Sequence, residues 1–310
     1  MASLSLLKKS DISLLKDKAI ELGCNVGYLE KDYYLVNVMK CLQEAAIDEG
    51  KLIFTGGTAL AKGYKLIKRF SEDCDFIFLS AVSSRSYLSR VKNLIHSHLT
   101  HHGFVVEAAK ARNNNANIEY QIAYPALSGD KTHLRPEVKL EIIHKKSLLT
   151  DYHQNSIQSF LSESKHQEPE ISNMECLSIE EISMGKLSSL IWRTLDQQKE
   201  HDPRLIRHLY DLSSLSHQLN NSEKFRDLCL SMIEADLIKR IKPSLSVSEA
   251  LERIIPELLN NPLHKKHYLN YLQNFIYEPM MINLLSFESA VEHLKKIIKS
   301  LQKHKRGLKA

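Results

Sequence analysis

The chain has 310 residues, of which 43% are hydrophobic and 25% are charged, and its formal net charge is +5. This composition is ordinary for a globular protein, and no apolar run approaches the roughly 18 residues that a membrane span needs. The first residues also lack the apolar run and cleavage site of a signal peptide. We therefore expect a cytoplasmic protein without a membrane partner.

Helices and strands alternate in the predicted structure of the first half of the chain. Apolar residues at helical or alternating spacing define each element, and Asn- and Gly-rich turns separate them. In chain order, the sequence predicts helices over 4–47 with a break at 23–27, a strand at 51–55, a helix from its N-cap Thr58 to about Lys68, a strand at 73–79, a helix at 83–102, and strands at 104–109, 117–124 and 136–143.

The chain from residue 178 onward is predicted to be almost entirely helical. The helices are expected over 178–198, 203–219, 222–235, 247–259, 263–276 and 285–304. The whole pattern predicts an α+β fold in which a sheet domain precedes a C-terminal helical domain. The expected parts are N-terminal helices packed on the core (1–50), the sheet core (51–160), a polar linker (162–173) and the helical domain (175–310).

Two glycines and two aspartates carry the strongest chemical signal. Gly56 and Gly57 stand between a predicted strand and a predicted helix, where they let the backbone turn tightly and a ligand approach closely. The N-terminus of the helix would offer unpaired N–H groups to a phosphate. Asp73 and Asp75 begin the next strand, so alternation places both carboxylates on one face, about 6–7 Å apart. Such a pair suits hard cations, and two Mg²⁺ ions are a standard device for phosphoryl transfer.

A third carboxylate is expected from a neighbouring strand. Glu141 is the best candidate, because it alternates with the apolar residues of its own strand. Glu137 lies on the same face and competes for this role, and Glu119 in the preceding strand is a weaker alternative.

Five short motifs resemble, in order, those of the AbiEii/AbiGii nucleotidyltransferase toxins. They are Glu30–Tyr34, Phe54–Leu60 together with Arg69–Asp75, Lys139–Glu141, Gly185–Leu187 and Arg207–Leu212. The resemblance covers about residues 28–215, and its specificity comes from the order of the motifs. Cys74 departs from the apolar residue that is usual between the two aspartates.

The resemblance implies a polymerase-β-like nucleotidyltransferase fold with a mixed sheet. It also implies the toxin half of a type IV-like toxin–antitoxin or abortive-infection system, whose antitoxin is encoded nearby. Characterised relatives transfer nucleotides from an NTP, and several modify the 3′ end of tRNA. The expected activity is therefore Mg-dependent nucleotidyl transfer, with two Mg²⁺ ions as cofactors, an NTP as substrate and RNA as acceptor.

The resemblance further implies roles for single residues. The metal ligands would be Asp73, Asp75 and Glu141, and the triphosphate would be held by Gly56, Gly57, Thr58 and Ser71. Lys186 would pair with phosphate oxygens and Asp211 would complete the site, in a cleft between the two domains. From spacing alone, Lys186 is alternatively a solvated lysine, and Asp211 has a structural partner in Arg207 four residues earlier.

Other patterns leave alternatives open. Residues 293–310 carry seven Lys or Arg and no acid, which suits either an RNA backbone or a solvated helix end. His98 and His102 have the spacing of a zinc pair, but no nearby Cys or acid completes the ligand set, which favours a solvated helix terminus. The five cysteines form no C-x-x-C pair and are expected to be buried thiols.

Two other functions remain as alternatives. The acceptor is alternatively a protein hydroxyl or a small molecule, and the chain is alternatively a catalytically silent nucleotide- or RNA-binding protein of the same fold.

Overall fold

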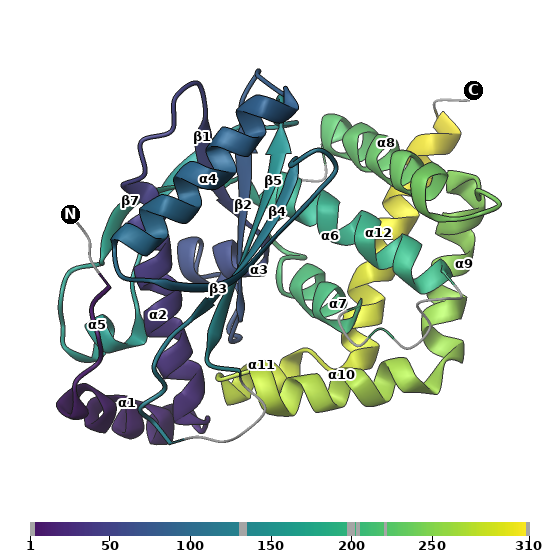
Figure 1. The fold of residues 1–310 in the computed structure, drawn as a ribbon. Helices are drawn as coiled ribbons and strands as arrows, with labels where there is room; N and C mark the ends of the chain where they lie inside the picture. Colours follow the sequence, from purple (N-terminus) through teal and green to yellow (C-terminus); the bar gives the residue numbers. More distant parts are fainter. Residues whose placement is uncertain (1–3, 130–134, 197–201, 203–204, 220–221, 308–310) are drawn as a thin grey trace. The chain divides into compact units, whose positions relative to one another are not determined.

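The computed structural model describes residues 4–129, 135–196, 202, 205–219 and 222–307. The chain divides into two compact units (Figure 1). Unit 1 contains Met1–Lys65 and Arg69–Ser178, and unit 2 contains Leu66–Lys68 and Ile179–Ala310. The predicted α+β fold is confirmed, because unit 1 holds a mixed sheet with flanking helices and the C-terminal region is helical.

Unit 1 is built around one seven-stranded sheet of order β3-β4-β5-β2-β1-β7-β6. Its elements are α1 (Lys9–Leu22), α2 (Val26–Gln43), β1 (Lys51–Thr55), α3 (Gly56–Thr58), the π-helix η1 (Ala59–Gly63), β2 (Asp73–Leu79), α4 (Arg85–His101), β3 (Val105–Arg112), β4 (Asn117–Ala123), β5 (Glu137–Lys145), β6 (Tyr152–Ile157), α5 (Phe160–Ser164) and β7 (Ile171–Leu177). β2 pairs in parallel with β5, and β1 with β7, whereas the other pairs are antiparallel.

Residue alternation gives the central strands an apolar face. In β4 and in most of β5 every second residue is buried, and the residues between are half-exposed. Helices α2 and α4 cover the buried face (Figure 1). There the Tyr120 hydroxyl donates to the Lys92 carbonyl of α4 (2.7 Å), and the rings of Phe78 and Tyr87 lie 6.1 Å apart. The opposite face of β2, β4 and β5 therefore carries the polar side chains.

The helix predicted from Thr58 to Lys68 is wrong. In its place α3 is a single turn, and η1 closes with a bond from the Tyr64 N–H to the Ala59 carbonyl (2.9 Å), five residues back. Thr58 is the last residue of α3 and precedes η1, and its side chain makes no capping hydrogen bond. The glycines are followed by a single α-helical turn and a short π-helix, so the dipole of a long helix does not act on a phosphate at this turn.

Tertiary bonds explain this departure from the local pattern. The Lys62 ammonium pairs with the Asp32 carboxylate of α2 at 2.5 Å. The Tyr64 hydroxyl donates to the Leu177 carbonyl of β7 at 2.9 Å. Helix propensity is a weak preference that tertiary bonds override. The backbone here forms a π-turn, in which the hydrogen bond spans five residues instead of four.

The predicted linker at 162–173 is also wrong. This segment contains the end of α5 and the start of β7, and the two units divide after Ser178. Glu170 fixes the connection, because its carboxylate accepts from the Ser159 N–H (3.0 Å) and the Ser162 hydroxyl (2.7 Å). Neither β6 nor β7 was predicted, because β6 is rich in polar residues and the apolar residues of β7 are interrupted by Ser172, Asn173 and Glu175.

The described part of unit 2 is a set of helices. They are α6 (Ile179–Leu195), α7 (Leu205–Ser214), α8 (Glu223–Arg240), α9 (Val247–Asn260), α10 (Pro262–Phe275), α11 (Pro279–Leu284) and α12 (Phe287–Gly307). Six of them match predicted helices, and α11 was not predicted. The predicted helix ends at 197–198 and 203–204 and the tail residues 308–310 lie outside the described residues. None of the helices described here has the length and apolarity needed to cross a membrane.

Candidate active site

Two glycines after β1 bring the backbone against charged side chains. Gly56 has a φ of 79°, a conformation that favours glycine, and a Cβ at this position would collide with the Asp75 carboxylate. A Cβ on Gly57 would collide with the guanidinium of Arg69. Gly56 is therefore favoured by both its φ and close packing, whereas a side chain at position 57 would have to displace the Arg69 guanidinium.

The Thr58 side chain ties this turn to the start of β2. Thr58 is almost fully buried, and its hydroxyl donates to the Asp73 carbonyl and lies 2.6 Å from the Ser71 hydroxyl. The bonds fix the chain just before Asp73 in spite of its irregular path after η1. Hydrogen bonds thus connect the glycine turn to the start of β2. This connected segment contains the predicted site residues Gly56, Gly57, Thr58, Ser71 and Asp73.

Strand register aligns the predicted carboxylates. Asp75 is paired with Thr55 in β1 and with Glu141 in β5, and Glu141 is in turn paired with Glu119 in β4. Paired residues on neighbouring strands lie about 5 Å apart with their side chains on the same face. The register favours Glu141 over Glu137 as the third carboxylate, because Glu137 lies before the first pair between β2 and β5.

Lys139 supplies positive charge within the carboxylate group. Its ammonium hydrogen-bonds with Glu141 and lies 3.6 Å from Glu119. Partial burial opposes the charge of Lys139, but the bond with Glu141 and the charges of Glu141, Asp73 and Glu119 raise its pKa above the ordinary value. Alternation had placed Lys139 on this face without giving it a role. A cation bound by Glu141 would have to displace this ammonium.

The carboxylates of Asp73, Asp75 and Glu141 share a face without converging on one point. Among the described residues, three ligand atoms that lie within 4.8 Å of one another come from Cys41, His98 and His102, and not from these carboxylates. The oxygen donors of these carboxylates nonetheless suit Mg²⁺, which takes one or two carboxylates and completes its shell with water and phosphate oxygens.

Lys186 and Asp211 form a buried ion pair in unit 2. The Lys186 ammonium, on α6, donates to the Asp211 carboxylate, on α7, at 2.6 Å. The Lys186 side chain is 8% exposed and the Asp211 side chain is 0% exposed. The solvated alternative for Lys186 is thus wrong, and Asp211 has the partner that burial of an acid requires. Arg207 stacks on Phe275, with its guanidinium 5.1 Å from the ring centre.

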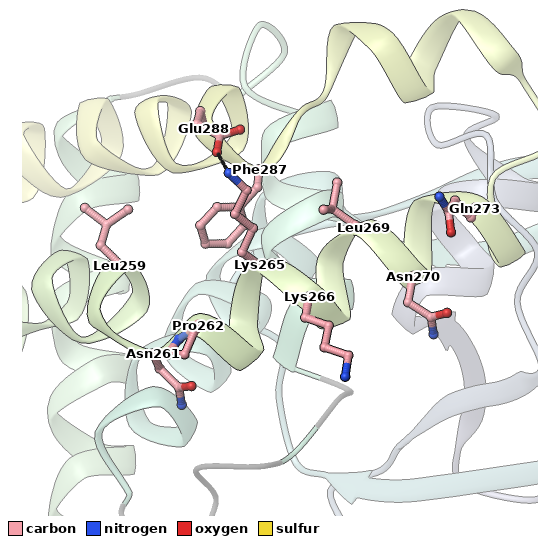
Figure 2. A pocket seen from close by; sticks show the side chains of 10 residues that line it. All are labelled: Leu259, Asn261, Pro262, Lys265, Lys266, Leu269, Asn270, Gln273, Phe287 and Glu288. Atoms are coloured by element: carbon pink, nitrogen blue, oxygen red, sulfur yellow. Dashed lines mark ion pairs between the residues drawn. The ribbon is translucent and has the colours of Figure 1, made fainter.

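A separate hollow lies in unit 2 between α9, α10 and the start of α12. Figure 2 shows Leu259, Leu269 and Phe287 at its apolar parts and the Lys265–Glu288 ion pair (2.5 Å) across it. None of the residues predicted to form the active site lines this hollow. It therefore takes no part in the candidate site.

A family model described as "Nucleotidyl transferase AbiEii toxin, Type IV TA system" matches residues 40–293. The chain belongs to the AbiEii family. It is accordingly a nucleotidyltransferase of a toxin family from type IV toxin–antitoxin systems, which implies an antitoxin partner. The AbiEii match also extends beyond residue 216, where the sequence offered no recognisable motif.

The fold of this AbiEii chain is similar to that of MenT4, a nucleotidyltransferase toxin from Mycobacterium tuberculosis H37Rv. The two chains share 13% identity with a TM-score of 0.51, and the similarity covers 94% of this chain and 97% of MenT4. At this identity the comparison supports the fold alone. No curated protein matches the AbiEii chain.

Proposed function

We propose that the AbiEii chain transfers a nucleotide from an NTP to a hydroxyl of RNA, at the 3′ end of tRNA, in a reaction that depends on Mg²⁺. The strand register is the observation that carries this proposal. It aligns Asp75 with Glu141 and sets Asp73 two residues earlier, beside the glycine turn. A carboxylate face next to a glycine turn is an arrangement that suits phosphoryl transfer.

Asp73, Asp75 and Glu141 are the residues that would hold Mg²⁺. Bound there, Mg²⁺ would lower the pKa of the acceptor hydroxyl and neutralise charge on the departing pyrophosphate. Because Lys139 is bonded to Glu141, its ammonium would compete with the cation for that carboxylate. The chain itself thus supplies both the ligands and a competing positive charge.

The glycine turn would receive the triphosphate. Without side chains, Gly56 and Gly57 let phosphate oxygens approach the backbone N–H groups. The hydroxyls of Thr58 and Ser71 hold the turn in register with Asp73. Lys186 would contact phosphate oxygens as a point charge, and Asp211 would orient its ammonium.

The end of α12 supports an RNA acceptor. One face of this helix is apolar and buried, through Val291, Leu294, Ile298 and Leu301. The other face carries an exposed basic stripe of Lys296, Lys299, Lys303 and Arg306. Their spacing of three or four residues aligns the charges on one side, where they can follow a phosphate backbone.

The test is to incubate the purified protein with Mg²⁺, each labelled NTP in turn and total bacterial RNA, beside the Asp73→Ala variant. We expect label in the tRNA band with the wild type and none with Asp73→Ala. Label on a protein or small molecule would keep the chemistry and reject the RNA acceptor. Nucleotide binding without any transfer would point to a silent binding protein.

A further inference from the structure

A second group of ligand-type side chains lies under the apolar face of the sheet. One ligand atom from each of Cys41, His98 and His102 lies within 4.8 Å of the other two. Cys41 is on α2, and the histidines stand at the C-terminal end of α4, which packs on α2. The expectation of a solvated helix terminus is therefore wrong here. Spacing could not reveal the cysteine, which lies 57 residues before His98.

Backbone carbonyls fix the protonation of both rings. His98 Nε2 lies 2.9 Å from the Cys41 carbonyl, and His102 Nδ1 lies 2.7 Å from the His98 carbonyl. A carbonyl only accepts, so in the neutral rings these two nitrogens carry the protons. The lone pairs are then on His98 Nδ1 and His102 Nε2. An N–H bonded to a backbone carbonyl is the usual arrangement that orients a metal-bound histidine.

Burial sets this group apart from a surface cluster. Cys41 is 0% exposed and His102 is 8% exposed. Burial first, and the charge of Glu44 second, raise the pKa of the Cys41 thiol to about 12. The rings of His98 and His102 lie only 4.3 Å apart between centres, so both can reach one ion.

We propose that Cys41, His98 and His102 bind one Zn²⁺ ion that joins α2 to α4. One thiolate sulfur and two imidazole nitrogens are ligands that select zinc rather than Mg²⁺. Around a tetrahedral zinc such atoms lie about 3.3–3.6 Å apart, so ligand atoms that now lie within 4.8 Å of one another would have to move closer together. On binding, the thiol proton passes to a water molecule lost by the hydrated ion, and the zinc–sulfur bond forms.

This site is separate from the proposed nucleotidyl transfer. The three residues lie on helices that cover the apolar face, whereas the carboxylates lie on the other face of the strands. Its role is to join α2, which packs on β2 and β5, to α4, which packs on β3. Its test therefore needs no assay of activity.

The first measurement uses Co²⁺ as a spectroscopic substitute for Zn²⁺. The full chain is stripped with a chelator and titrated with Co²⁺, and the near-ultraviolet band of a cobalt–thiolate bond is followed. We expect one Co²⁺ per chain, displaced by Zn²⁺, and a Zn²⁺-dependent rise in the thermal midpoint. Cys41→Ser should abolish the band, and His102→Asn should weaken binding by more than about 10-fold.

Matched controls separate this site from the others. Cys229→Ser removes another buried thiol, and His96→Asn removes another histidine of α4. Asp75→Asn alters the carboxylate face. All three should keep the band. Absence of a thiolate band in the folded wild type, or a band that survives in Cys41→Ser, would overturn the proposal and leave a hydrogen-bonded histidine pair in the core.

Discussion

The carboxylate of Asp75 occupies the space that a Cβ at position 56 would need. This contact joins the end of β1 to Asp75, the proposed metal ligand on β2. The glycine at position 56 is thus set both by its φ of 79° and by the aspartate.

Gly56→Ala should abolish transfer, because the added methyl group must push the Asp75 side chain away. Gly23→Ala is the matched control, since Gly23 also has a positive φ (61°) but no atom within 4 Å of an added Cβ. Each change should lower the free energy of unfolding by about 1–2 kcal/mol, the cost of a left-handed alanine. Urea titrations and transfer assays would compare them. Equal activity in the two variants would show that the Asp75 contact is unimportant.

Lys139→Gln should lower the Mg²⁺ concentration that half-saturates transfer. The ammonium bonded to Glu141 competes with a cation for that carboxylate, and losing a pair worth about 1 kcal/mol corresponds to about a fivefold change. Lys145→Gln, on the same strand, is the control and should leave this value unchanged. A higher Mg²⁺ requirement in Lys139→Gln would instead mean that Lys139 positions Glu141 for the metal.

Variants of the buried Lys186–Asp211 ion pair can distinguish a structural role from a role in transfer. Lys186→Met or Asp211→Leu alone removes one member of the buried ion pair and should cost about 3–5 kcal/mol of stability. The double variant should recover most of this loss, because an apolar pair needs no compensation, yet it should remain inactive if Lys186 contacts phosphate. Denaturation and transfer assays on the three variants decide the point. An active, stable double variant would make the pair purely structural.

The lowered pKa of His293 predicts that the free energy of unfolding falls in acid. Burial first, then the charges of Lys296 and His217, lower its pKa below 6.5 in the fold. The unfolded chain therefore binds more protons in this range, so stability falls as the pH drops from about 6.5 through the folded pKa. His293→Gln should show a smaller loss between about pH 7.5 and 5.5. His153→Gln, an exposed histidine, is the control, and equal losses in both variants would contradict the assignment.

Sequence patterns predicted the strands of the carboxylate face because these strands alternate cleanly. β4 and β5 bury every second residue along most of their length, so period and burial agree. The same rule placed Asp73, Asp75 and Glu141 on one face. It favoured Glu141 but left Glu137 and Glu119 as alternatives, because register between strands far apart in the chain is set by tertiary pairing.

Long-range contacts also explain what the sequence did not reveal. The Lys62–Asp32 pair and the Tyr64 hydroxyl replace a predicted helix by a π-turn, and both act across distant segments. β6 lies at the sheet edge, where polar residues are tolerated, so its apolar signal is weak. Cys41 joins His98 and His102 only through the packing of α2 on α4.

The most direct test of the central claim is the rate of Mg-dependent nucleotidyl transfer by Asp75→Asn. This change keeps the shape of the side chain and removes its charge, and Asp151→Asn, at an exposed acid outside the site, serves as the control. The account predicts that Asp75→Asn lowers the transfer rate by more than about 100-fold with an unchanged fold. Loss of a metal ligand should cost more than loss of a residue that only hydrogen-bonds to a ligand, which typically costs about 10- to 100-fold. Transfer at the wild-type rate in Asp75→Asn would contradict the account.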